Sequence, residues 1–250
     1  MTKNTIHLLK WYVVAAFFVG LLLFGLVSAL LRGDSPVIFE IAFGILVAVL
    51  IMLRTRQKAL LLFREPTPDR AIAYYHNSTR RIPNGKAMAA YLSAFAAVLY
   101  GDFDRAREEL TAVNWTVTPP MYQGFEVYIR SLLSIFQTKN YAEALQFAKE
   151  ARDLCEVSGK FQGAKTSRAA FDANIAVCNL LLGDSGPELL AQINSAAKTL
   201  PGVSPAISAW ALATYHSGAG RPDVAEGYIA VVRRLLPHSV CLKDLSLSAK

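Results

Sequence analysis

Two long apolar runs stand near the beginning of the chain. Trp11–Leu31 contains no charged residue, and Pro36–Leu53 contains only Glu40. At about 1.5 Å of rise per helical residue, each run can cross a hydrocarbon core of about 30 Å. The first run exceeds the ~7–15 apolar residues of a cleaved signal peptide, and a second run follows it at once. The pattern therefore predicts a transmembrane helical hairpin with spans at about 11–31 and 36–53.

Basic residues flank this hairpin on both sides and predict its orientation. Lys3 and Lys10 precede the first run, while Arg54, Arg56 and Lys58 follow the second. The link between the two runs carries no net charge. Because short flanks rich in Lys and Arg stay in the cytoplasm, both termini are expected there. We therefore expect a two-span membrane protein, with a bacterial inner membrane as its location.

The remaining chain, from Thr67 onward, has a helical period. Apolar residues recur at three- and four-residue spacings, without the sustained alternation that marks strands. Gly, Pro and polar pairs divide this part into helices of roughly 12–18 residues. Capping side chains followed by Pro, or by an acid three residues later, mark the helix starts. These signals are Thr67-Pro68, Thr118-Pro119, Ser204-Pro205, Asn140 with Glu143, and Ser185 with Glu188. The fold class is predicted to be all-α.

A short sequence recurs four times between the predicted helices. The copies are Gly101–Ala106, Lys139–Ala144, Gly183–Glu188 and Gly220–Ala225, and their starts lie 38, 44 and 37 residues apart. Each copy stands between two segments of helical period. A repeat of this length indicates stacked helix pairs, in which neighbouring pairs bury a core that one pair cannot bury alone.

This arrangement resembles the tetratricopeptide repeat (TPR) family, in which a tight turn joins helix A to helix B of each pair. A small residue after the turn lets the two helices approach closely, and Ala106, Ala144 and Ala225 match it. The resemblance covers residues 67–238 and implies a TPR-like α-solenoid that begins with an unpaired helix B at Asp69–Arg81. The third copy lacks the Ala, and the spacings exceed the 34 residues of the family. A related helical-hairpin solenoid is therefore the alternative.

The resemblance also implies a concave, protein-binding face built mainly from the A helices. By the register of the family, this groove is lined by Tyr91, Phe95, Leu99, Ile129, Leu133, Phe136 and Trp210. TPR proteins that bind the acidic C-termini of chaperones carry Lys, Arg and Asn at these places, whereas the residues here are apolar. Such a groove suits an amphipathic helix or another hydrophobic segment. Alternatively, the same side chains pack against one another as core, because periodicity alone does not separate a core from a groove.

The positive charge of the chain is confined to one stretch. There are 26 Lys and Arg against 19 Asp and Glu, which gives a formal net charge of +7. Residues 54–86 hold +6 of this excess, and residues 87–250 are neutral. A nucleic-acid-binding domain carries its positive charge on its folded surface, so we expect no nucleic-acid partner. The basic stretch instead suits anionic lipid. The predicted headgroup contacts are Arg54, Arg56, Lys58 and Arg64.

The sequence contains no recognisable catalytic, metal-binding or cofactor-binding pattern. The four His and three Cys include no pair at metal-ligand spacing. Gly159–Thr166 superficially matches a phosphate-binding loop, but its glycines stand four apart instead of five, and Ala164 interrupts the Gly-Lys pair. We therefore expect no enzyme activity, no cofactor and no small-molecule substrate.

These patterns divide the chain into four parts. Residues 1–53 are the predicted anchor, 54–66 a basic linker, 67–238 the TPR-like solenoid and 239–250 a C-terminal tail. The predicted function is a membrane-anchored adaptor or scaffold that binds or assembles other proteins at the cytoplasmic face. Its expected partners are other proteins and the lipid bilayer. The alternatives are an accessory structural subunit of a larger membrane complex and an enzyme whose site the sequence does not reveal.

Overall fold

The computed structural model describes residues 44, 45, 47, 49, 60–158 and 164–243. Helices and turns, but no strands, form this part of the chain, which confirms the all-α prediction. The helices are α3 (Asp69–Thr79), α4 (Gly85–Tyr100), α5 (Phe103–Thr111), α6 (Pro120–Leu133), α7 (Tyr141–Val157), α8 (Ala164–Leu181), α9 (Pro187–Thr199), α10 (Pro205–Gly218) and α11 (Pro222–Leu235). Two short 3₁₀ segments, η1 (Trp115–Val117) and η3 (Cys241–Lys243), and one π-helical turn, η2 (Ser134–Thr138), complete the set.

The two predicted membrane spans fall almost entirely outside the described residues. Among the residues that are described, no helix has both the length and the apolar character needed to cross a bilayer. The transmembrane hairpin therefore stays a prediction. The same holds for the predicted lipid contacts Arg54, Arg56 and Lys58, which also lie outside the described residues.

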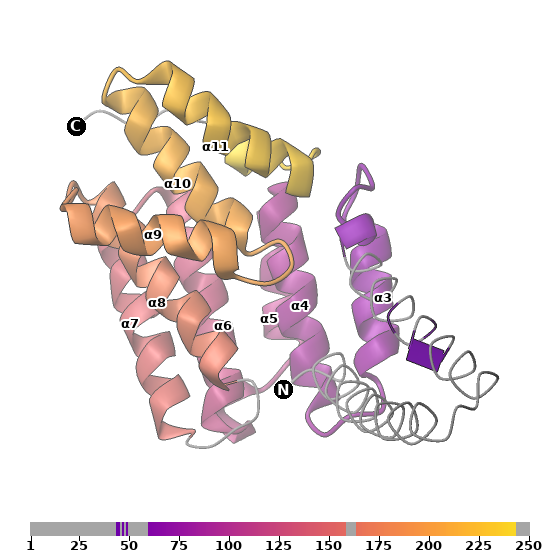
Figure 1. The fold of residues 1–250 in the computed structure, drawn as a ribbon. Helices are drawn as coiled ribbons and strands as arrows, with labels where there is room; N and C mark the ends of the chain where they lie inside the picture. The colour runs from indigo at the N-terminus through magenta and orange to yellow at the C-terminus, as the bar shows by residue number, and fades with distance from the viewer. Residues whose placement is uncertain (1–43, 46, 48, 50–59, 159–163, 244–250) are drawn as a thin grey trace, which may run out of the picture.

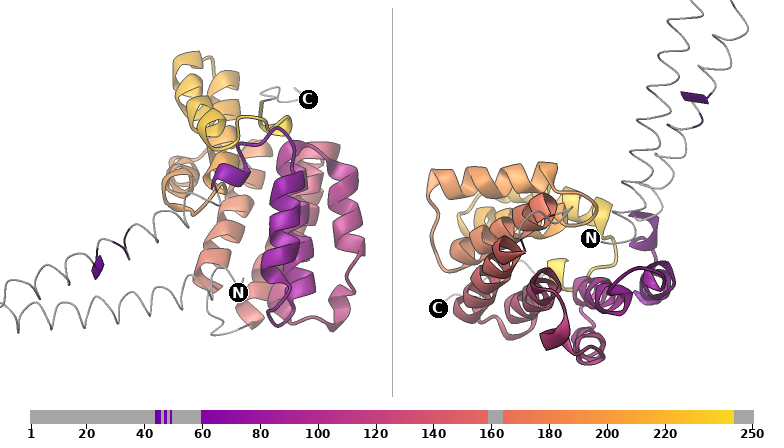
Figure 2. Two further views of the ribbon diagram at one scale, coloured as in Figure 1. Left: turned by 90° about the vertical axis from the view of Figure 1, so that its right-hand side faces the viewer. Right: turned by 90° about the horizontal axis from the view of Figure 1, so that it is seen from below.

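Consecutive helices pack side by side along the chain. Contacts join α3 to α4, α4 to α5, α6 to α7, and so on through α10 and α11. Some helices that stand two places apart in the chain are also in contact, namely α4 with α6 and α8 with α10. Figure 1 shows α3, α4 and α5 running alongside one another, whereas α9 and α11 run at a steep angle to them. Figure 2 shows this change in helix direction from two further sides. Each helix therefore packs mainly against helices that stand next to it or two places away in the chain.

The four copies of the recurring sequence all lie at turns between paired helices. They separate α4 from α5, η2 from α7, α8 from α9 and α10 from α11. The first residue of every copy has a left-handed backbone, with φ of 82° at Gly101, 53° at Lys139, 103° at Gly183 and 69° at Gly220. The next residue in each case donates its amide to a carbonyl in the last turn of the preceding helix. Such bonds satisfy carbonyl groups that a helix end leaves unpaired.

Two of the five predicted helix starts coincide with the structure, and the other three lie one residue too early, because Pro68, Pro119 and Gly186 occupy the cap positions of α3, α6 and α9. Asn140 caps α7 by accepting a hydrogen bond from the amide of Glu143, as the sequence predicts. Ser204 precedes α10, whose first residue is Pro205. The third repeat differs, because α9 begins at Pro187 with Gly186 before it, and not at Ser185. Five residues separate α8 from α9, whereas two, two and three residues separate the helices at the first, second and fourth copies.

A single hydrophobic core runs through the described chain, from Phe63 to Leu242. Ala106 of α5 and Ala144 of α7 are completely buried in it. Gly124 of α6 lies close to α7, since a side chain there would meet the carbonyl oxygen of Ala151 at 3.0 Å. Small residues thus set the distance between paired helices. The core also extends past residue 238 into the segment predicted as a tail, because Leu242 is fully buried.

A buried chain of hydrogen bonds joins three helices inside this core. The Asn174 side-chain amide of α8 donates to the Ser131 hydroxyl of α6 at 2.8 Å. Ser131 in turn donates to the carbonyl oxygen of Ala144 on α7 at 2.7 Å. Buried polar groups are costly when they are unpaired. These hydrogen bonds therefore favour the observed alignment of α6, α7 and α8 over alignments in which the helices are shifted.

Candidate functional site

The seven residues predicted to line a protein-binding groove lie on α4, α6, η2 and α10. Leu99 and Ile129 are fully buried. Phe95, Phe136 and Trp210 expose 7%, 9% and 6% of their surface, and Tyr91 and Leu133 are partly buried against the same core. Their burial matches the self-packed alternative. A role for these residues in binding a partner stays a prediction.

Aromatic rings connect α4, α6 and α8 into a continuous ladder. Tyr91 of α4 stacks on Phe125 of α6, with ring centroids 4.4 Å apart. Phe95 pairs with Tyr128 of α6 at 6.3 Å, and Tyr128 pairs with Phe171 of α8 at 5.2 Å. Offset and edge-on ring pairs of this kind each add roughly 0.5–1.5 kcal/mol beyond the area they bury. The ladder therefore joins α4, α6 and α8 through contacts between their own rings.

Three members of this ladder, Phe125, Tyr128 and Phe171, are absent from the sequence prediction. The family register places Ile129 and Leu133 on the inner face of α6, whereas the rings that contact α4 and α8 stand at Phe125 and Tyr128. Aromatic pairs spaced three or four residues apart, on α4 and again on α6, are the signal that would have found them. Burial raises the pKa of the Tyr128 hydroxyl well above its usual value, as expected for a phenol without access to water.

In the described part of the basic stretch 54–86, four exposed basic side chains lie on both sides of α3. Arg64 is exposed and lies before the start of α3, whereas Arg80, Arg81 and Lys86 are exposed beyond its end. Because α3 has 11 residues, its two ends are about 16 Å apart. None of these four side chains forms an ion pair with another described residue. The basic residues that the sequence groups together therefore face two different regions.

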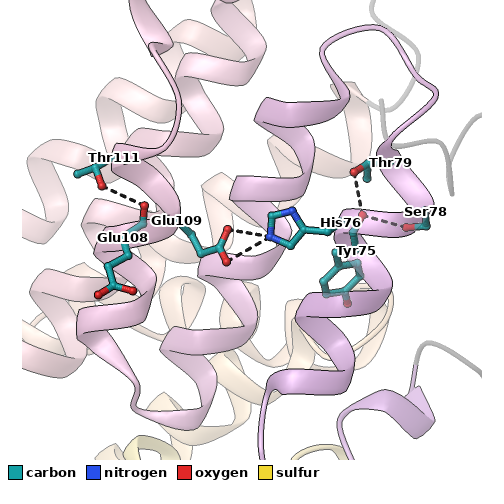
Figure 3. Close-up of polar contacts among 7 residues, drawn as sticks. All are labelled: Tyr75, His76, Ser78, Thr79, Glu108, Glu109 and Thr111. Carbon is teal, nitrogen blue, oxygen red and sulfur yellow. Dashed lines mark hydrogen bonds and ion pairs between the residues drawn. The ribbon is translucent and has the colours of Figure 1, made fainter.

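Two ion pairs join α3 to α5. Arg105 contacts Asp69 at 2.6 Å, and His76 Nε2 lies 3.0 Å from a carboxylate oxygen of Glu109. Figure 3 shows His76 and Glu109 pointing toward each other from the two helices. Hydrogen bonds from the side chains of Thr67 and Arg105 lower the pKa of Asp69. These side chains are substantially exposed apart from Glu109, so they orient the helices more than they stabilise them.

A charged, solvent-open cleft lies over α7, α8 and α9. It is lined by Lys149, Arg152, Asp153, Asp172, Ile175 and Gln192 and has a volume of about 350 Å³. We call this surface the charged cleft. At its side, the Arg152 guanidinium bridges Glu156 at 3.2 Å and Asp172 at 3.0 Å. Arg168 contacts the same Glu156 at 2.8 Å, which makes a four-residue network of alternating charges.

Two charges in the charged cleft stand outside that network. Lys149 and Asp153 are exposed one turn apart on α7, and neither pairs with another described residue. A surface with a free cation, a free anion and the apolar Ile175 side chain offers contacts to a polar protein segment. The ion-pair network beside it holds the surrounding side chains in place. Of the surfaces described above, the charged cleft combines the most open volume with unpaired charge.

The described residues offer little for metal or thiol chemistry. No group of three or more His, Cys, Asp or Glu side chains could hold a metal ion within the part of the chain that the structure describes. Cys155 and Cys178 are buried, and burial raises the pKa of the Cys178 thiol to about 12. Burial likewise raises the pKa of Cys241 to about 11. At neutral pH these thiols are protonated and therefore weak nucleophiles.

Comparisons with known proteins add no relative on which to base a function. No family model, no curated protein and no solved structure matches this chain at a significant level.

Proposed function

We propose that this protein is a membrane-anchored helical-repeat scaffold, TPR-like in its helix pairs, that binds or assembles other proteins at the cytoplasmic face. The observation that carries the proposal is the left-handed turn that recurs at Gly101, Lys139, Gly183 and Gly220. Helix pairs joined in the same way stack into an extended surface, which is the usual basis of protein binding in helical-repeat proteins. The proposal includes no catalytic role and no cofactor.

The apolar runs Trp11–Leu31 and Pro36–Leu53 support the anchoring half of the proposal. Each is long enough to cross a bilayer, and the basic residues on their outer flanks favour a cytoplasmic location for both termini. In this arrangement the helical domain follows the second span after a few residues. The domain would therefore meet its partners close to the membrane surface.

We place the partner at the charged cleft and not on the aromatic ladder. Side chains such as Leu99 and Ile129 are fully buried, so a partner would have to separate packed helices to reach them. The charged cleft is already open, and its unpaired Lys149 and Asp153 can each pair with an opposite charge on a partner. Charge complementarity of this kind selects a partner more than it adds affinity. The partner class is a protein segment that carries both charge signs.

Co-purification in mild detergent tests the partner site. The full-length protein should retain a protein that the double variant Lys149→Ala with Asp153→Ala loses. The matched control, Lys86→Ala with Asp223→Ala, removes one exposed charge of each sign from other helices and should retain it. Mass spectrometry identifies the retained proteins, and melting temperatures establish that both variants are folded. Equal retention by the two double variants would contradict a partner at the charged cleft.

A second function, an accessory structural subunit of a larger membrane complex, is favoured by one observation. The ladder from Tyr91 to Phe171 leaves the domain with a filled interior, which suits a rigid support better than a peptide-gripping groove. The same co-purification separates the two functions. A stable complex of fixed stoichiometry would favour the subunit, whereas substoichiometric partners would favour the scaffold.

A further inference from the structure

The segment that enters the folded domain is fastened to the C-terminal end of α4. Phe63 is 3% exposed and stacks on the ring of Tyr100, with centroids 6.3 Å apart. The Tyr100 hydroxyl donates to the carbonyl oxygen of Glu65 at 2.7 Å. Between and beside these anchors, Leu61 exposes 53% of its surface and Arg64 is also exposed. The entering chain is therefore held against α4 and does not hang from it as a free linker.

The C-terminal segment, residues 236–243, packs on the same end of α4. Leu236 and Leu242 are buried, and the Cys241 thiol donates to the carbonyl oxygen of Val98 at 3.3 Å. A side chain placed at Gly101 would lie 3.4 Å from Val240. Val240 itself exposes 68% of its surface, and Lys243 is exposed as well. Figure 1 shows the end of α11, which leads into this segment, beside the end of α4.

Two segments far apart in the sequence thus present the same combination beside one helix end. Each has buried anchors together with one exposed apolar and one exposed basic side chain, namely Leu61 with Arg64 and Val240 with Lys243. We call these four residues the α4-end surface. Among the described acidic residues beside it, Glu65 pairs with Arg70, and Asp102 accepts a hydrogen bond from the amide of Arg105. Exposed apolar and basic side chains in combination are typical of surfaces that rest on anionic lipid.

We propose that the α4-end surface lies on the anionic face of the bilayer, so that the C-terminal segment is a second membrane contact. This inference rests on the proposed membrane anchor. The second apolar run ends at Leu53, and seven residues of extended chain reach about 25 Å at most. Leu60 therefore lies within that distance of the end of the anchor. The anchor brings the α4-end surface to the membrane, and the anchored Phe63 fixes which side of the domain faces it.

The opposite end of α3 supplies a matched control. Arg80 and Arg81 carry the same charge as Arg64 and Lys243 but follow the last turn of α3, a helix about 16 Å long, whereas Arg64 precedes its first turn. Val117 is the matched control for Val240, because it is a similarly exposed valine (78%) at another place. It lies in η1, which follows the end of α5 that is away from Gly101. The inference predicts that only the residues of the α4-end surface sense the lipid.

The experiment uses the full chain in nanodiscs that contain phosphatidylserine and a lipid with a nitroxide headgroup. In a background in which the three cysteines are replaced by serine or alanine, an environment-sensitive fluorophore is attached at Val240→Cys or at Val117→Cys. The Val240 probe should lose fluorescence to the nitroxide, and the Val117 probe should not. Arg64→Gln with Lys243→Gln should abolish this loss, while Arg80→Gln with Arg81→Gln should leave it unchanged.

The outcomes separate this inference from the proposed anchor. Equal quenching of the two probes, or a Val240 probe that is shielded from water without being quenched, would overturn the α4-end surface as a lipid contact. The latter result would indicate a protein on that surface. Failure of the full chain to remain with the nanodiscs after detergent removal would instead overturn the membrane anchor itself.

Discussion

Several tyrosine hydroxyls in this domain are removed from water, and Tyr100 is the one whose role is easiest to isolate. Its ring packs on Phe63, and its hydroxyl donates to the carbonyl oxygen of Glu65. Burial, together with the negative charge of Glu65, raises the pKa of Tyr100 to about 12 from its usual value of 10.0. Burial raises the pKa of Tyr75 and Tyr91 as well. The folded state therefore holds these protons more tightly than the unfolded chain does.

This difference predicts a loss of stability at alkaline pH. For an acid whose pKa is raised on folding, the stabilisation is complete below the unfolded value and is lost as pH rises through the folded value. For Tyr100 that window runs from pH 10.0 to about 12. We expect the free energy of unfolding, measured with urea across this range, to fall less steeply in Tyr100→Phe than in the natural chain. At neutral pH the free energy of unfolding of the variant should be lower by about 1 kcal/mol, because the hydrogen bond of the Tyr100 hydroxyl is missing. Parallel curves for the two proteins would contradict the prediction.

At the scale of the elements, the repeated turn is the feature that organises the fold. Each copy reverses the chain through one residue with positive φ, and three of the four use glycine there. Glycine reaches this region without the clash that a Cβ atom creates. Gly220 has open space around it, so nothing but its backbone conformation demands glycine. Gly227, in the middle of α11, has equally open surroundings but a helical backbone.

These two glycines predict opposite effects of the same substitution. Gly220→Ala should lower the free energy of unfolding by about 1–2 kcal/mol, because it forces a Cβ atom into a left-handed conformation. Gly227→Ala should raise it by about 0.5–1 kcal/mol, because alanine loses less freedom than glycine on entering a helix. Chemical denaturation of both variants measures the difference. A gain at Gly220 would show that the turn does not require a left-handed residue, and a loss at Gly227 would contradict the expected gain in helix stability.

At the scale of the whole molecule, the segment 236–243 packs against one of the first helices of the described domain, α4. Leu242 is completely buried in the core that also contains Phe63 and the ladder residue Phe171. The stack of helix pairs is thereby closed at α4, since η3 contacts both α4 and α10. A terminal pair in an open stack would lack this contact on one side. We therefore expect the first and last helix pairs to unfold together.

Truncation of one side chain tests this closure. Leu242→Ala should cost about 2–5 kcal/mol of unfolding free energy, as for other fully buried leucines. It should also expose Cys241, whose thiol has a pKa of about 11 while the segment is packed. We expect faster reaction of Cys241 with a thiol reagent at neutral pH in this variant. Leu182→Ala, at a side chain that is 49% exposed, is the control and should change neither quantity appreciably. A small effect at Leu242 would mean that the segment is not part of the cooperative unit.

The sequence by itself determined the features of this protein that depend on neighbours along the chain. The all-α class follows from apolar residues three and four apart, and the start of α7 follows from the Asn140 side chain within reach of the Glu143 amide. The repeated turns were readable because a left-handed residue favours glycine wherever it occurs. These features are local, so a short window of sequence contains the physics that produces them.

Only the tertiary structure decided which apolar and basic residues share a surface. Ile129 and Phe125 both fit the apolar period of α6. Only the packing of α4 and α8 against α6 shows that Phe125 is the one in contact with the aromatic rings of both helices. Arg64 and Arg81 belong to one basic stretch, yet the length of α3 places them at opposite ends of a helix. The meeting of Val240 with Gly101 joins segments separated by most of the domain. Such contacts depend on how the helices stack, and no periodicity within one helix encodes them.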